Sequence, residues 1–164
     1  MWNPTKRVTL LRAILLLVVL FAVVATPAAN KVKPPENPAQ IKLSVEPGSI
    51  TPGGSARVTV ELAPMDGVKI NQYPKIQFKV TAEEGLVGAA AVSMGNDTPP
   101  AEENLKDNAF KELKPLHLTI ELDQAAPKGK HELAGKVTYA YCMSGKDYFC
   151  ARKRVSVKIP ITVQ

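Results

Sequence analysis

Cys142 and Cys150 are the residues of this chain whose type and spacing best suit chemistry, and they are its only cysteines. Seven residues lie between them, and the polar stretch from Ser144 to Asp147 is typical of a turn between two strands. If residues 145–147 form a three-residue loop, Cys142 faces Cys150 across the hairpin. The Cβ atoms of such a pair lie within about 5 Å, so the sulfurs can form a disulfide. The pair is therefore either a structural cross-link or a redox-active group.

The alternation of apolar residues predicts which face of this hairpin carries the sulfurs. Apolar residues occupy odd positions from 155 to 163 and again at 133, 137, 139 and 141. Successive residues of a strand point to opposite faces, so both cysteines are expected on the outer face of the sheet. Arg152 and Arg154 share that face, and nearby cations lower the pKa of a thiol. A β-bulge between Cys150 and residue 155 would reverse this assignment.

The elements that must position the hairpin are short strands. Apolar and polar residues alternate in segments separated by Pro and Gly turns, namely 41–45, 56–62, 68–71, 76–80 and 116–122. Residues 86–94 are apolar and small, and they are interpreted as a possible buried strand. This spacing predicts an all-β fold, an immunoglobulin-like β-sandwich of seven to nine strands. The polar stretch 95–108 is expected to be a surface loop, either a simple insertion or a cover for a site.

Residues 1–29 resemble a secretory signal peptide in composition. Three basic residues within the first twelve precede an apolar run from Ala13 to Ala25, and small residues follow. The run is short for a membrane span, although residues 8–25 could remain as an uncleaved inner-membrane anchor. We therefore expect an exported protein, periplasmic or secreted. In such a compartment a disulfide persists.

After this leader, residues 30–40 are expected to form an extended linker and residues 41–164 a single domain. The net charge of the chain is +6, and the leader holds three basic residues and no acidic one. The remaining lysines are spread along the strands rather than bunched, so we predict solvated faces and no nucleic-acid partner. Contact with a membrane is expected only through an uncleaved leader.

No other group of residues suggests catalysis or a bound cofactor. His117 and His131 are isolated in the sequence, and both cysteines belong to one hairpin, so no metal-binding cluster is predicted. The chain also lacks a serine in a nucleophile elbow and a glycine-rich phosphate loop. Neither a metal nor a cofactor is expected.

Two motifs make the chain resemble the amino-terminal, immunoglobulin-like domain of the thiol:disulfide interchange protein DsbD and its stand-alone relatives. Tyr139-Ala-Tyr-Cys142, the second cysteine and the final strand match the layout of that domain's last hairpin. Gly67-Val-Lys-Ile-Asn71, followed by Pro74 and a strand, resembles an upstream element of the family. Lys69 stands where the family often has histidine.

The resemblance implies that Cys142 and Cys150 exchange thiols and disulfides with envelope thiol-disulfide oxidoreductases, without a cofactor. It also motivates the hypothesis that nearby aromatic residues shield the pair between encounters, and these are Tyr73, Tyr141, Tyr148 and Phe149. Ordinary strand packing is the alternative for each aromatic residue. For the protein, the alternative is a non-catalytic β-sandwich that binds another envelope protein and uses the disulfide only as a structural cross-link.

Overall fold

The computed structural model describes residues 34–102, 108–145 and 148–164. The predicted leader, residues 1–29, lies outside these described residues. The strands are β1 (Ala39–Glu46), β2 (Ser55–Pro64), β3 (Val68–Ile70), β4 (Ile76–Val80), β5 (Ala90–Met94), β6 (Leu116–Glu121), β7 (Gly129–Met143) and β8 (Phe149–Val163). β1 begins inside the stretch predicted to be a linker. Over the described ranges, no helix has the length and apolar character needed to cross a membrane.

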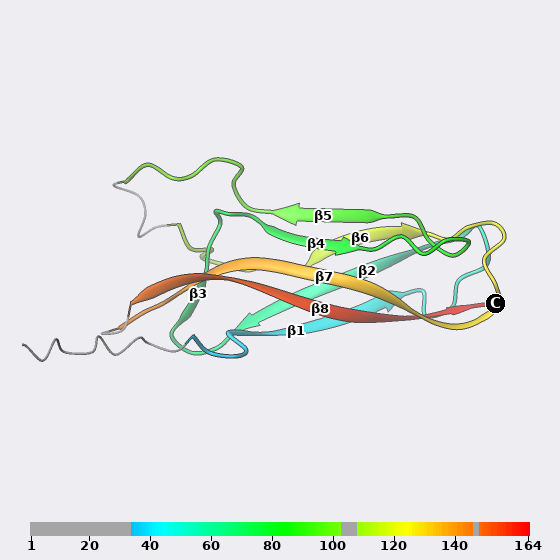
Figure 1. Cartoon of the computed structure of the whole chain (residues 1–164), viewed down its shortest axis with the longest axis horizontal. Helices are drawn as coiled ribbons and strands as arrows, with labels where there is room; N and C mark the ends of the chain where they lie inside the picture. The colour runs from blue at the N-terminus through cyan, green and yellow to red at the C-terminus, as the bar shows by residue number, and fades with distance from the viewer. Residues whose placement is uncertain (1–33, 103–107, 146–147) are drawn as a thin grey trace, which may run out of the picture. The chain divides into compact units, whose positions relative to one another are not determined.

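The strands form two antiparallel sheets, one of β1, β2 and β6 and the other of β3, β4, β5, β7 and β8. In the second sheet β7 pairs with β8 along one edge and with β4 and then β3 along the other, while β5 pairs with β4 (Figure 1). This order corresponds to strands A-B-E and G-F-C-C′ of the immunoglobulin fold. The predicted immunoglobulin-like sandwich is therefore confirmed.

Between β1 and β2 the chain crosses from the first sheet to the second at Ile50. The backbone N–H of Ile50 donates to the carbonyl of Thr162 (2.9 Å), and the N–H of Gln164 donates to the carbonyl of Ile50 (3.0 Å). Ile50 thus lies parallel to the end of β8, next to Val163. This crossing ties the two sheets together at the end of the domain that holds the C-terminus (Figure 1).

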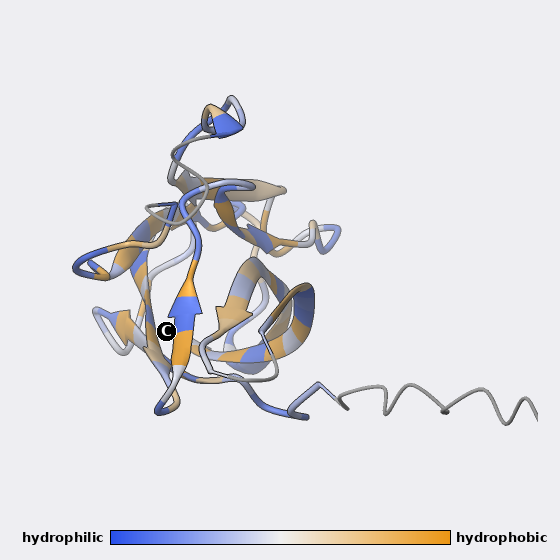
Figure 2. Cartoon of the chain, turned by 90° about the vertical axis from the view of Figure 1, so that its left-hand side faces the viewer, coloured by the Kyte–Doolittle hydropathy of each residue, from blue (hydrophilic) through white to orange (hydrophobic). Residues whose placement is uncertain are grey.

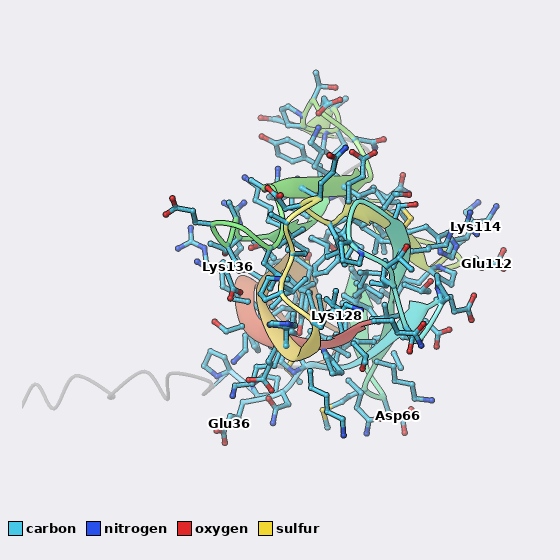
Figure 3. The ribbon with its side chains drawn as sticks, turned by 90° about the vertical axis from the view of Figure 1, so that its right-hand side faces the viewer. Glu36, Asp66, Glu112, Lys114, Lys128 and Lys136 are labelled. Carbon is cyan, nitrogen blue, oxygen red and sulfur yellow. A yellow bond between two sulfur atoms is a disulfide. The ribbon has the colours of Figure 1, made fainter. Side chains whose placement is uncertain are left out.

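The core lies between the inner faces of the sheets, as strict alternation along the strands requires. Val58 of β2, Phe78 of β4, Leu133 of β7 and Ile159 of β8 are fully buried there. Polar and apolar bands alternate along the strands (Figure 2). Exposed charged side chains project outward, among them Lys136 (Figure 3).

The long β7–β8 hairpin keeps one register from Gly129–Val163 to Met143–Phe149, and Cys142 pairs with Cys150. The ladder of fifteen pairs contains no bulge. Tyr139 and Tyr141 therefore point inward, as predicted, and both cysteines point outward. The tip of the hairpin lies at the end of the domain that holds β3, opposite the C-terminus (Figure 1).

The prediction of one buried strand over residues 86–94 is wrong in its first half. Leu86 and Val87 are buried, but they belong to a tight turn in which their N–H groups donate to the carbonyl of Glu83 (both 3.0 Å). β5 begins only at Ala90 and is half-exposed, because it pairs with β4 alone at the sheet edge. A run of small apolar residues does not reveal where such a turn ends.

One buried polar group in the core gives a stability prediction. The side chain of Tyr139 is 1% exposed, and its hydroxyl makes no hydrogen bond of normal geometry among the described residues, although the backbone of Ala39 lies close enough to lower its pKa. Burial, with a smaller contribution from Tyr141, raises the pKa of Tyr139 to about 12. The unfolded chain releases this proton near pH 10, whereas the folded chain retains it to about pH 12. The folded state should therefore lose stability as the pH rises from 10 toward 12.

We expect Tyr139→Phe to be neutral or stabilising by about 1 kcal/mol at pH 7, because it removes a buried hydroxyl that makes no hydrogen bond of normal geometry. The variant should also lose less stability than the wild type between pH 10 and 11, with Tyr141 retaining part of the dependence because its pKa is also raised. Urea unfolding at pH 7, 10 and 11 measures both effects. Tyr148→Phe, at an exposed position, is the control. Equal pH profiles for Tyr139→Phe and the wild type would contradict the assignment.

Candidate functional site

Cys142 and Cys150 form a disulfide at the outer end of the β7–β8 hairpin, with their Cα atoms 4.0 Å apart. Their predicted positions, opposite each other and on the outer face, are confirmed. The two sulfur-bearing residues differ in environment, because Cys150 is exposed whereas Cys142 is half-buried. β8 pairs with β7 on one side only, so Cys150 lies at a sheet edge and Cys142 lies between two strands.

The neighbours of Cys142 come from β3 and the residue that follows it. Lys69 is the cross-strand partner of Cys142, on the side opposite Cys150. The side-chain amide of Asn71, 8% exposed, donates through Nδ2 to Cys142 Sγ over 3.1 Å. The backbone N–H of Asn71 donates to the carbonyl of Ala140 (2.9 Å), which holds the residue against β7. Cys142 therefore has a hydrogen-bond donor directed at its sulfur.

A second segment holds β3 from its other side. The N–H of Phe110 donates to the carbonyl of Ile70 (2.9 Å), and Ala109 forms an antiparallel bridge with Asn71. These residues follow the predicted loop 95–108, of which residues 103–107 lie outside the described part of the chain. Sequence reasoning missed this contribution to the site. Its one available signal is the pair of apolar residues, Ala109 and Phe110, at the end of a polar stretch.

A hollow of about 530 Å³ borders the disulfide on the Cys142 side. Lys69, Asn71 and Ala109 line the hollow. Met143, Ser144 and Tyr148 also contribute to its lining. The lining therefore combines apolar side chains with a cation and an amide, and it includes one of the two cysteines.

Of the four aromatic residues expected to shield the pair, Tyr148 is the one whose hydroxyl lies beside both sulfurs. Its hydroxyl lies 3.3 Å from Cys150 Sγ and 3.9 Å from Cys142 Sγ, and the side chain is 66% exposed. Tyr141 is buried on the opposite face, with Phe149 packed edge-on against it at a ring-centroid distance of 6.1 Å. These two residues support the hairpin from inside.

Tyr73 is held through its backbone rather than directed at the disulfide. Its N–H donates to Asn108 Oδ1 (3.0 Å), and Asn108 Nδ2 donates to its carbonyl (2.8 Å). Tyr73 is half-buried and does not contribute to the lining of the hollow. In the segment 71–73, the residue that reaches the sulfur is Asn71.

The electrostatic surroundings of the disulfide are positive. Lys69 and Arg152 are exposed and share its face, while Lys146 and Asp147 of the turn lie outside the described residues. Cations and N–H donors both stabilise a thiolate and so lower the pKa of a reduced cysteine. Within the described residues, no cluster of three or more His, Cys, Asp or Glu side chains is arranged to hold a metal.

No protein-family model matches this chain, and no curated protein matches it. Among solved structures, murine CRIg is similar over 76% of this chain and 98% of the CRIg chain, with 12% sequence identity and a TM-score of 0.36.

Proposed function

We propose that this protein exchanges thiols and disulfides with oxidoreductases of the cell envelope through Cys142 and Cys150. The observation that carries the proposal is the hydrogen bond from the buried Asn71 amide to Cys142 Sγ, beside an exposed Cys150. A hydrogen-bond donor directed at one sulfur stabilises the thiolate that forms on that sulfur when the S–S bond breaks.

In the proposed reaction, a partner thiolate attacks Cys150 Sγ. A bond forms between that sulfur and the partner, the Cys142–Cys150 bond breaks, and the electron pair leaves on Cys142 as a thiolate. The partner's second thiolate then attacks the partner's first sulfur in the mixed disulfide. The partner disulfide forms, and Cys150 is released as a thiolate. Two electrons have passed to this protein, and the partner dithiol has become a disulfide. The reverse sequence passes the electrons to an oxidised acceptor.

Exposure and leaving-group chemistry both favour Cys150 as the attacked sulfur. An attacking sulfur must approach along the S–S axis, from the side opposite the leaving sulfur. Cys150 lies on the edge strand β8, whereas Cys142 lies between β8 and β3, with Lys69 as its cross-strand partner. The same Lys69, together with Asn71, lowers the free energy of a thiolate on Cys142. A thiol of lower pKa leaves faster.

Reduction of the oxidised protein by dithiothreitol, a small neutral dithiol, tests the proposal. We expect a rate proportional to the dithiothreitol concentration and far above the rate of global unfolding, because Cys150 is exposed in the folded state. A rate limited by unfolding, and independent of dithiol concentration, would instead indicate a structural cross-link. That result would favour the alternative of a non-catalytic binding domain.

Asn71→Ala should slow the same reaction. A hydrogen bond to a charged group contributes about 1.5 kcal/mol, which corresponds to about a tenfold lower rate constant. The pKa of the reduced Cys142 thiol should rise in the variant, as measured by the pH dependence of its alkylation. Gln72→Ala is the matched control, because that neighbouring amide donates to the carbonyl of Ala109 rather than to a sulfur. An unchanged rate and thiol pKa in Asn71→Ala would refute the role of Asn71.

A further inference from the structure

The outer face of the five-stranded sheet gathers positive charge from strands that are far apart in the sequence. Seven exposed cations lie on it, and Lys130 and Lys158 are the two farther from the hairpin tip on their strands. The other five define the basic face: Lys69, Lys79, Lys136, Arg152 and Arg154. The basic residues are spread along the strands, as expected, and the pairing of the strands places these five on one surface. Strand pairing brings alternate residues of β3, β4, β7 and β8 onto one side.

The register fixes how these cations lie relative to the disulfide. Lys79 is directly opposite Lys136, and Arg154 is opposite Thr138, one outward position nearer the hairpin tip. Arg152 follows, and then Cys150. Alternate residues on a strand are about 7 Å apart, so Arg152 and Arg154 lie within about 14 Å of Cys150 along β8. The basic face leads directly to the sulfurs.

Carboxylates do not balance this charge within the sheet. Glu132 is the one acidic residue in strands β3, β4, β5, β7 and β8, and it pairs with Lys158 over 2.6 Å. Like charges directly opposite each other, as in Lys79–Lys136, are destabilising. The Lys79–Lys136 pair therefore does not stabilise the folded state.

The other sheet shows the contrasting arrangement. Its exposed cations, Lys42 and Arg57, lie directly opposite Glu61 and Glu46 in the β1–β2 register. Opposite charges in such positions are favourable. The two outer faces thus differ in charge. The cations of the β1–β2–β6 sheet lie opposite carboxylates of the same sheet, whereas those of the basic face have no carboxylate opposite them.

We propose that the basic face is the docking surface for an acidic surface of the protein that exchanges thiols with Cys142–Cys150. This inference rests on the proposed function and adds the chemistry by which the partner is recognised. Anionic lipids and nucleic acids also attract cations, but a partner that carries thiols must meet the outward-facing sulfurs that end this surface. Charge complementarity of this kind raises association rates by roughly 10- to 1,000-fold at low ionic strength.

Two synthetic dithiol peptides test the inference, one flanked by glutamates and its twin flanked by glutamines. The rate constant for reducing the oxidised protein is measured for each peptide and normalised to the same peptide's rate with neutral hydroxyethyl disulfide, which corrects for differences in thiol reactivity. We expect the glutamate peptide to react at least about tenfold faster at low salt. The advantage should disappear at 1 M salt, where the screening length falls to about 3 Å.

Charge-neutralising variants localise the effect. Arg152→Gln with Arg154→Gln should remove most of the advantage of the glutamate peptide. The matched control, Lys42→Gln with Arg57→Gln, removes the same net charge from the other sheet and should retain the advantage. Reduction by neutral dithiothreitol should be somewhat slower in the Arg152 and Arg154 double variant, because Arg152 lies beside the disulfide and helps to stabilise a thiolate. The ratio of the two peptide rates within each variant cancels this effect.

The possible results separate this inference from the proposed function. Equal normalised rates for the two peptides, with normal reduction by dithiothreitol, would overturn the docking surface and leave the exchange function standing. If the disulfide resists every thiol, the exchange function fails. Binding of an acidic surface is then tested separately, by the NMR shifts of basic-face amides when a glutamate peptide with serines in place of its cysteines is added. Such shifts would support it, and their absence would overturn it. Tighter binding of phosphatidylglycerol vesicles or an oligonucleotide than of the peptide would overturn the partner class.

Discussion

Cys142→Ser is expected to capture a partner as a stable mixed disulfide on Cys150, whereas Cys150→Ser should capture the same partner at least about tenfold more slowly. Both single variants should lose all electron transfer, because neither can form the internal disulfide. The asymmetry follows from the exposure of Cys150 at the edge of β8 and the half-buried position of Cys142 beside β3. Incubation with glutathione disulfide followed by mass spectrometry measures the rate of capture. Each rate is divided by the thiolate fraction at that pH, because the Cys142 thiol is expected to have the lower pKa.

The control for this experiment is the same pair of variants unfolded in urea, in which the two thiols should react at similar rates. Faster capture by Cys142 in the folded protein would contradict the assignment of Cys150 as the attacked sulfur. Entry would then take place through the hollow lined by Lys69 and Asn71.

Gly135→Ala should give a large loss of stability. Gly135 lies on the inner face of β7, where an added Cβ would come within 2.9 Å of Val157 Cγ2, 3.0 Å of Ile159 Cδ1 and 3.1 Å of Phe78 Cε2. Three buried or half-buried side chains would have to shift, and overpacking of this kind costs about 1–3 kcal/mol. Chemical denaturation measures the loss directly.

Gly88→Ala serves as the control, because an added Cβ there meets no atom within 4 Å. Reduction of the disulfide by dithiothreitol should be unchanged in the folded Gly135→Ala protein, since Gly135 lies on the opposite face of β7 from Cys142. A neutral effect of Gly135→Ala on stability would contradict the close packing of the sheets at this point.

The outward face of the cysteines was predictable from sequence because it depends only on counting residues along two adjacent strands. The period of two holds from Leu133 to Tyr141 and from Val155 to Val163, and a short turn fixes the register between the strands. The all-β fold followed from the same pattern with its Pro and Gly turns. Local information sufficed for both.

Features that depend on pairing between distant segments were not predictable in this way. The Lys79–Lys136 pair joins residues from β4 and β7, and the sequence contains no local signal for that register. The same is true of Ala109, which reaches the site only because its segment pairs with the outer edge of β3. Asn71 stood out in the sequence only as part of the Gly67–Asn71 motif, and its hydrogen bond to Cys142 Sγ required the structure.

The reduction potential of the Cys142–Cys150 disulfide tests the central claim most directly. The folded protein, without the leader, would be equilibrated in graded dithiol buffers, and its thiols would be trapped by alkylation and counted by mass spectrometry. A labile exchange pair should have a potential of about −120 to −270 mV, within the range of known exchange proteins. A potential below about −300 mV is typical of structural disulfides and would contradict the proposed function.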